Sequence, residues 1–202
     1  MFELSPASMP HRKVHKHTRD DWRTPGYVFD ALNNRFAFDG DACASDENHL
    51  VDNYFTQKTC ALASRWSQLG PSVYMNPPYS QSESFAARAY AAVRDAEVSR
   101  VVALMPSTTD TRWFHRYVVG KATELWFVRG RLSFVCPIAL TPVSGNPVGS
   151  MVIVWGEGEA GWAGTRTGSL RSKDMSPFSK EDKAYWSSSS ISAGSSNQLD
   201  LW

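Results

Sequence analysis

Apolar residues in this chain are grouped into short continuous runs and into longer stretches where they recur every three or four positions. The short runs are typical of buried strands, and the spaced stretches are typical of helices with one apolar face. The runs predict strands at 73–75, 100–105, 123–128 and 150–155, with a further short strand at Phe36–Asp39.

Stretches with helical spacing lie between the predicted strands. One begins at Thr24-Pro25, interpreted as N-cap and first helical residue, one begins at Ser82, and one carries Trp113. Strands that alternate with helices predict an α/β fold, with a mostly parallel sheet and helices on both faces. The last two strands flank the Pro- and Gly-rich loop Cys136–Gly149, so we expect them to pair as an antiparallel hairpin at one edge of the sheet.

Composition divides the chain into three parts. Its 202 residues suit one α/β domain, which we expect at 21–163, preceded by a flexible arm at 1–20 that contains the basic stretch 11–19. From Gly164 onward the chain is rich in Ser, Gly, Thr and Lys, which predicts a mostly disordered tail at 164–202. Trp186 and Trp202 could still anchor parts of that tail.

Cysteine usage and hydropathy exclude several classes of protein. Cys43, Cys60 and Cys136 are odd in number and widely spaced, which indicates neither a disulfide framework nor a zinc site. No apolar stretch approaches the length needed to span a bilayer. We therefore expect a soluble cytoplasmic protein with no bound metal and no membrane partner.

The strongest chemical signal is the tetrapeptide Asn76-Pro77-Pro78-Tyr79, which follows the predicted strand at 73–75. The Asn76 side-chain oxygen and the Pro77 carbonyl can each accept an N–H bond of an exocyclic amine, which localises the nitrogen lone pair for attack on a methyl group. Two successive prolines hold the turn extended, and Tyr79 offers an aromatic face to a base that has left its stack. The alternative is a Pro-Pro turn that only ends a strand.

Two other segments are expected at the same edge of the sheet, and each could contact a cofactor. A helix start near Thr24 suits a carboxylate, although Thr24 could simply cap that helix. Small residues and Asp41 after the first strand would let a ligand approach and would bind an ammonium group or ribose hydroxyls, although Asp-Gly-Asp is also an ordinary turn. The candidate cofactor-binding residues are Trp22, Thr24, Pro25, Asp41, Ala42, Cys43 and Ala44.

Basic residues suited to a nucleic-acid backbone occur in the arm, after the strand at 100–105 and after the strand at 123–128. In the last two places they lie next to aromatic residues, a combination that favours nucleic-acid binding. The arm could equally be a solvated terminus. The candidates for DNA contact are Arg12, Lys13, Lys16, Arg112, Arg129 and Arg131.

The order of these motifs resembles the phage-type Dam family of DNA N-6-adenine methyltransferases over about residues 20–156. The motifs are Trp-x-Thr-Pro at 22–25, Phe-Asp-x-Asp-Ala-x-Ala-Ser at 38–45, Asn-Pro-Pro-Tyr-Ser at 76–80, Leu-Met-Pro-Ser at 104–107 and Gly-Arg-Leu-Ser-Phe at 130–134. The resemblance implies a Rossmann-like sheet, S-adenosyl-L-methionine as cofactor, and double-stranded DNA as substrate. It also implies a phage or prophage origin, a place in the bacterial host cytoplasm, and residues 76–79 as the catalytic segment.

Other functions share part of this pattern. Asn-Pro-Pro-Tyr is also similar to the motif of enzymes that methylate RNA bases or protein glutamine amides, and a catalytically silent nucleic-acid-binding protein of the same fold is an alternative of a different class. No segment remains for a separate recognition domain, so we expect a short or relaxed target site. Protection of phage DNA from host restriction is the purpose we favour, over a restriction–modification pair. The sequence predicts neither the target sequence nor the oligomeric state.

Overall fold

The computed structural model describes residues 18–143, 146–157 and 165–188. Within them, six strands form one sheet in the order β1-β2-β3-β5-β4-β6. Only β5 runs against its neighbours, and the other adjacent pairs are parallel. The strands are β1 (Gly40–Asp41), β2 (Ser72–Met75), β3 (Arg100–Pro106), β4 (Glu124–Arg129), β5 (Ser150–Gly156) and β6 (Arg166–Arg171).

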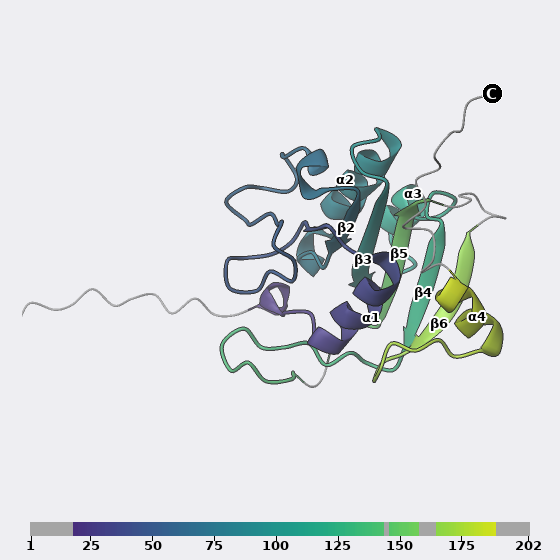
Figure 1. Cartoon of the computed structure of the whole chain (residues 1–202). Helices are drawn as coiled ribbons and strands as arrows, with labels where there is room; N and C mark the ends of the chain where they lie inside the picture. The colour runs from purple at the N-terminus through teal and green to yellow at the C-terminus, as the bar shows by residue number, and fades with distance from the viewer. Residues whose placement is uncertain (1–17, 144–145, 158–164, 189–202) are drawn as a thin grey trace, which may run out of the picture.

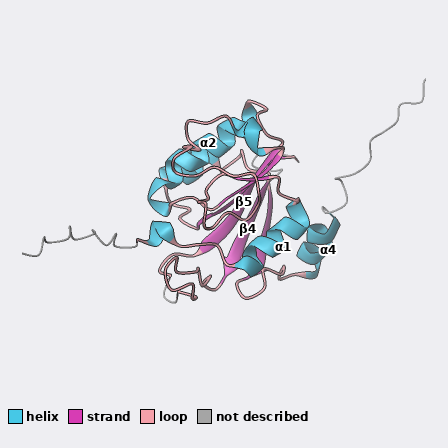
Figure 2. Ribbon diagram, turned by 60° about the vertical axis from the view of Figure 1, so that its left-hand side comes forward, coloured by secondary structure: helices cyan, strands magenta, loops and turns pink. Residues whose placement is uncertain are grey.

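Helices cover both faces of this sheet (Figures 1 and 2). One face packs against α1 and α4 and the other against α2 and α3, because successive strand residues point to opposite faces and form two separate apolar clusters. The protein is therefore a mixed α/β fold. The helices are α1 (Gly26–Phe36), α2 (Ser82–Arg94), α3 (Arg112–Tyr117) and α4 (Lys180–Ser188), with 3₁₀ turns η1 (Arg19–Asp21), η2 (Trp66–Leu69) and η3 (Tyr79–Gln81).

The predicted helices after Thr24 and Ser82 and around Trp113 are confirmed, as are the four longer strands. The strand at Phe36–Asp39 is wrong. Helix α1 continues through Phe36, Ala37 ends it with a left-handed backbone, and only Gly40 and Asp41 pair with β2. The aromatic residues that suggested a strand pack in the core instead, where the Phe36 and Phe38 rings stack 6.1 Å apart.

The two strands expected as an edge hairpin do pair antiparallel, but they are not at an edge. Strand β5 lies between β3 and β4, and β6 covers the other side of β4. The physical reason is burial: every side chain from Met151 to Trp155 is excluded from solvent, which requires neighbours on both faces and both edges of β5.

The expectation of a disordered tail is wrong for residues 165–188, which form β6 and α4 and extend the sheet of the main domain. Helix α4 is held by Trp186, whose ring meets that of Trp126 at 4.8 Å, and by Asp182, which accepts a hydrogen bond from Arg166 at 2.8 Å. These contacts stabilise a segment whose composition alone is too polar to fold. The basic stretch 11–17, residues 158–164 and residues 189–202 lie outside the described residues.

No helix in the described ranges is long and apolar enough to cross a membrane. Over the same ranges, no group of three His, Cys, Asp or Glu side chains could hold a metal ion.

Candidate active site

The site lies along the end of the sheet where the five parallel strands have their carboxyl ends and the antiparallel β5 begins. Because β1, β2 and β3 are parallel, Asp41 and Asn76 follow neighbouring strand ends. The Ser107 N–H after β3 donates to the Gly149 carbonyl before β5 at 2.9 Å, which joins the two loops at that edge. Open α/β sheets bind ligands at this position.

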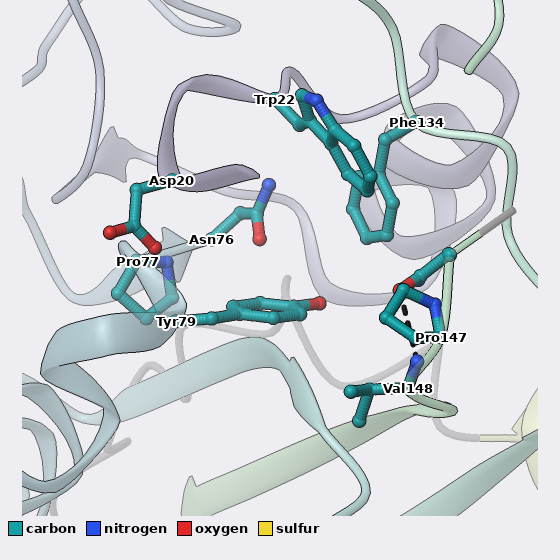
Figure 3. A pocket seen from close by; sticks show the side chains of 9 residues that line it. Asp20, Trp22, Asn76, Pro77, Tyr79, Phe134, Pro147 and Val148 are labelled. Carbon is teal, nitrogen blue, oxygen red and sulfur yellow. Dashed lines mark hydrogen bonds between the residues drawn. The ribbon is translucent and has the colours of Figure 1, made fainter. Parts of the chain in front are cut away.

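A small cavity of about 180 Å³ lies beside the Asn-Pro-Pro-Tyr turn and is lined by Asn76, Pro77 and Tyr79 of that turn (Figure 3). Cavities of about 150 Å³ accept a benzene-sized ring, so this one suits a small planar ring system. The Tyr79 ring forms one wall, opposite Trp22 and Phe134, with Asn76 between them (Figure 3). The lining residues are Asp20, Trp22, Asn76, Pro77, Tyr79, Phe134, Asn146, Pro147 and Val148.

The aromatic wall is assembled from two distant parts of the chain. Arg23 and Val135 exchange a pair of backbone hydrogen bonds of 3.0 Å each, which lays the loop after β4 against the segment before α1. The Trp22 and Phe134 rings consequently stack at 6.2 Å. The Tyr79 ring meets Phe134 edge-on at 6.1 Å, so the stacked pair and the tyrosine face define a slot.

The Asn76 side chain is held in one orientation. Its Nδ2 donates a hydrogen bond of 3.0 Å to the Thr24 hydroxyl, which shares a second hydrogen bond of 2.9 Å with the Tyr74 hydroxyl. One of the two N–H donors of the amino group is thereby used, which fixes the amide orientation and leaves the carbonyl oxygen as an acceptor. Thr24 was expected to cap α1, but the residue before that helix is Pro25 and no side chain caps it, so Thr24 orients Asn76 instead.

Burial keeps Tyr79 in its neutral form, because it raises the pKa of the phenol well above its usual range. The Ser150 hydroxyl lies nearby, but the two form no hydrogen bond of standard geometry. Tyr79 therefore presents an uncharged aromatic face to the cavity.

A larger cavity of about 850 Å³ adjoins the small one, and Asp20, Trp22 and Asn76 line both. The structure brings most of the candidate cofactor residues together here. Pro25 is buried and accepts the first hydrogen bonds of α1, so it begins the helix rather than lining the cavity. The candidate cofactor residues that line the larger cavity are Trp22, Thr24, Asp41, Ala42, Cys43 and Ala44. Pro78 of the tetrapeptide also lines this cavity.

Asp41 is the buried carboxylate of the larger cavity. Its Oδ1 accepts the N–H of Cys43 at 2.9 Å. Burial raises the pKa of Asp41 from 3.8 to about 6, although the N–H groups of Cys43 and Leu50 oppose the shift. A buried carboxylate with a raised pKa is a candidate for a functional site. A ligand that donates hydrogen bonds or carries positive charge would offset the cost of burying the charged carboxylate.

The candidate DNA-contacting residues Arg112, Arg129 and Arg131 are exposed. Arg129 is the last residue of β4, Arg131 follows it, and Arg112 begins α3 after β3, so all three lie near the strand ends that carry the cavities. The Arg129 guanidinium lies 3.9 Å from the centroid of Phe178, and Arg171 at the end of β6 lies 4.4 Å from it. Arg171 was not predicted as a candidate, because its segment was expected to belong to the disordered tail. Arg12, Lys13 and Lys16 lie outside the described residues.

Part of the smaller cavity was not predicted from the sequence, namely Asp20 and the segment Asn146–Val148. The Asp20 carboxylate accepts the N–H of Ser80 at 3.1 Å and so fixes η1 against the tetrapeptide turn. No spacing in the sequence indicates this contact, since the partners are 60 residues apart.

The protein is thus of the α/β class, with two adjoining cavities at the carboxyl ends of its strands: one of ring size beside an oriented amide, and a larger one with a buried carboxylate. Comparison with known proteins agrees: the family described as DNA N-6-adenine-methyltransferase (Dam) matches residues 11–182. The chain belongs to this family.

Two relatives illustrate the similarity. The chain is 30% identical over 154 residues, which cover 69% of it, to the DNA N-6-adenine-methyltransferase of Escherichia phage T1. It is 31% identical over 122 residues, 59% of the chain, to the DNA N-6-adenine-methyltransferase of Haemophilus phage HP1 (strain HP1c1). The aligned parts span 63% and 69% of the lengths of these relatives.

Proposed function

We propose that this protein transfers a methyl group from S-adenosyl-L-methionine to the N6 amine of adenine in DNA. The observation that carries the proposal is the oriented amide of Asn76, a residue that lines both the ring-sized cavity and the larger one. An acceptor in this position suits the amine of a base in the small cavity. The names of the phage relatives support the choice of adenine in DNA.

In the proposed mechanism the target adenine leaves the duplex and lies against Tyr79. The oxygens of Asn76 and Pro77 accept the two N–H bonds of its amine. These hydrogen bonds strengthen as positive charge develops on the nitrogen, so they stabilise the transition state more than the ground state. S-adenosyl-L-methionine, when bound, would supply the electrophilic methyl group and leave as S-adenosyl-L-homocysteine, and the methylated amine would then release one proton to water. The uncharged ring of Tyr79 and the wall formed by Trp22 and Phe134 hold the base in line with the larger cavity.

The larger cavity fits this cofactor chemically. Asp41 is a buried carboxylate without a cationic side chain in hydrogen-bond contact among the described residues, and ribose hydroxyls or a ligand ammonium would satisfy it. Ala42 and Ala44 leave room for a ligand near the backbone. With Asp41 at the end of β1 and Asn76 at the end of β2, we assign the sheet to the Rossmann-like methyltransferase class.

Asp41→Asn is expected to weaken cofactor binding about 10- to 100-fold above pH 7, because it removes a charge-assisted hydrogen bond. The wild-type affinity should also fall as the pH drops below about 6, where Asp41 takes up a proton, whereas the variant should lack this dependence. Calorimetric titration with S-adenosyl-L-methionine at pH 5, 6 and 8 measures both. Equal affinities at pH 8 would reduce Asp41 to a turn residue.

Asp41→Asn should also change how the free energy of unfolding of the ligand-free protein depends on pH. A raised carboxyl pKa means that the folded state binds the proton more tightly, so this contribution to wild-type stability is present below pH 4 and is lost as the pH rises through about 6. Below pH 4 this contribution to the free energy of unfolding amounts to about 3 kcal/mol. The wild type should therefore lose stability relative to Asp41→Asn between pH 4 and 7 in denaturant titrations.

We propose double-stranded DNA as the partner and the cytoplasm of a bacterial host as the place of action, with the protein encoded by a phage or prophage. The basic arm with Arg12, Lys13 and Lys16, together with Arg112, Arg129 and Arg131, would contact phosphates and position the duplex without reading its sequence. We accordingly expect a short or relaxed target site, with protection of phage DNA from restriction as its purpose.

Arg131→Ala is expected to weaken DNA binding about equally on all sequences and to lower the slope of log affinity against log salt by about one. The matched control is Arg94→Ala, since Arg94 is also exposed but lies at the end of α2, away from the strand ends of the site. Fluorescence anisotropy with a labelled duplex at 50–300 mM salt distinguishes the two. If both variants behaved alike, the surface around Arg131 would not be the DNA-binding face.

The proposed function is tested by supplying tritiated S-adenosyl-L-methionine with duplex DNA, RNA or a protein extract as acceptor. Label should enter DNA and should be lost with Asn76→Ala. Label in RNA or protein alone would indicate one of the related methyltransferases. Binding of DNA without transfer to any acceptor would indicate the catalytically silent alternative.

A further inference from the structure

Asn146 contributes a buried amide to the wall of the small cavity. The residue is 6% exposed, and its Nδ2 has no hydrogen-bond partner among the described residues. The N–H of Val148 donates to its Oδ1 at 3.2 Å, which identifies the oxygen and leaves the amino group as the free donor.

A buried donor without a partner is unfavourable by about 1–3 kcal/mol, so such groups in a native structure need an explanation. The location of Asn146 offers an explanation, because this residue lines the small cavity beside the Asn-Pro-Pro-Tyr turn. Figure 3 shows Pro147 and Val148, which follow Asn146, across the cavity from Asn76 and beyond the hydroxyl end of Tyr79. The cavity thus carries a free acceptor on Asn76 and a free donor on Asn146.

An adenine has the complementary pattern. Its exocyclic amine donates, and each of its ring nitrogens N1, N3 and N7 accepts. A guanine differs, because an acceptor oxygen replaces the amine and would face the Asn76 oxygen.

We infer that Asn146 binds the target base by donating a hydrogen bond from Nδ2 to a ring nitrogen of the adenine whose amine is held by Asn76. This inference rests on the proposed function, since it takes adenine as the base. Asn146 thereby fixes the rotation of the base within its plane. In that orientation the Asn76 oxygen accepts from the amine of adenine but would face the acceptor oxygen of guanine.

The test combines substitutions of the residue with substitutions of the base. Duplexes carrying 1-deaza-, 3-deaza- or 7-deazaadenine at the target each replace one ring nitrogen with C–H. One of them should lower wild-type kcat/KM about tenfold more than it lowers that of Asn146→Ala, because the variant has already lost the hydrogen bond. If all three duplexes affected wild type and Asn146→Ala equally, the inference would be wrong.

Asn146→Asp is the matched control. The carboxylate keeps an oxygen for the Val148 N–H but removes the donor, so at pH 8 it should lose as much activity as Asn146→Ala, or more. Activity close to that of wild type would assign Asn146 to loop structure and overturn the inference. Methylation of unmodified adenine by the wild type distinguishes failure of the proposed function from failure of this inference. If the wild type did not methylate adenine, the proposed function would be contradicted. If it did, but the deaza substitutions affected wild type and Asn146→Ala equally, only this inference would be contradicted.

Discussion

Asn76→Ala is expected to lower the rate of methyl transfer about 100- to 1,000-fold while leaving the affinity for S-adenosyl-L-methionine largely intact. The loss is comparable to that caused by removing one preorganised hydrogen bond at a centre of developing charge. Asn76 lines the larger cavity only in part, and Asp41 and the small residues of that cavity remain. Single-turnover kinetics, with cofactor binding measured in parallel, checks both. A rate within a few-fold of wild type would contradict the proposed role of Asn76.

Variants of Thr24 test whether the orientation of the Asn76 amide, and not only its presence, affects the rate of methyl transfer. Thr24→Val removes the hydroxyl that accepts the Asn76 Nδ2 hydrogen bond, with little change in size. We expect about a tenfold loss of rate, because the amide can then turn its amino group toward the base. Thr24→Ser keeps the hydroxyl and should retain most of the activity.

Glu124→Ala is expected to destabilise the fold by about 3–5 kcal/mol, because it removes the carboxylate that is paired with a buried guanidinium. The Arg35 and Glu124 side chains are 1% and 9% exposed and are joined by contacts of 2.8 and 2.9 Å. Trp126 and Tyr185 donate further hydrogen bonds to the same carboxylate. Since Tyr185 belongs to α4, the substitution should also release that helix. Urea denaturation followed by far-UV circular dichroism measures the loss.

The control for Glu124 is Asp95→Ala, which breaks the exposed ion pair with Arg94. Exposed pairs contribute little, so its denaturation curve should overlay that of wild type. Similar curves for Glu124→Ala and wild type would show that the ion pair with Arg35 does not anchor α4.

Local patterns in the sequence predicted the central strands and placed the Asn-Pro-Pro-Tyr turn at the end of one of them. The run before Asn76 was predicted as a strand because its residues are continuously apolar, and it forms β2. The Asn-Pro-Pro-Tyr turn indicates its chemistry by residue type alone. Asp41 was predicted to face a ligand from its place after the first strand, and it lines the larger cavity.

The order of the strands could not be predicted in the same way. The runs at β4 and β5 are both continuously apolar, and nothing local indicates that β5 enters between β3 and β4. The second wall of the small cavity was missed for a related reason. Phe134 reaches Trp22 only through the Arg23–Val135 pairing, which is a tertiary contact. Helix α4 was missed because a few aromatic and charged contacts, rather than an apolar stripe, hold it in place.

The most direct test of the central claim is the identity of the methylated nucleoside. Duplex DNA incubated with the protein and S-adenosyl-L-methionine is digested to nucleosides and analysed by mass spectrometry, with Asn76→Ala in parallel. The proposed function predicts N6-methyl-2′-deoxyadenosine with the wild type and little or none with the variant. A different methylated nucleoside, or equal amounts of product from both proteins, would contradict it.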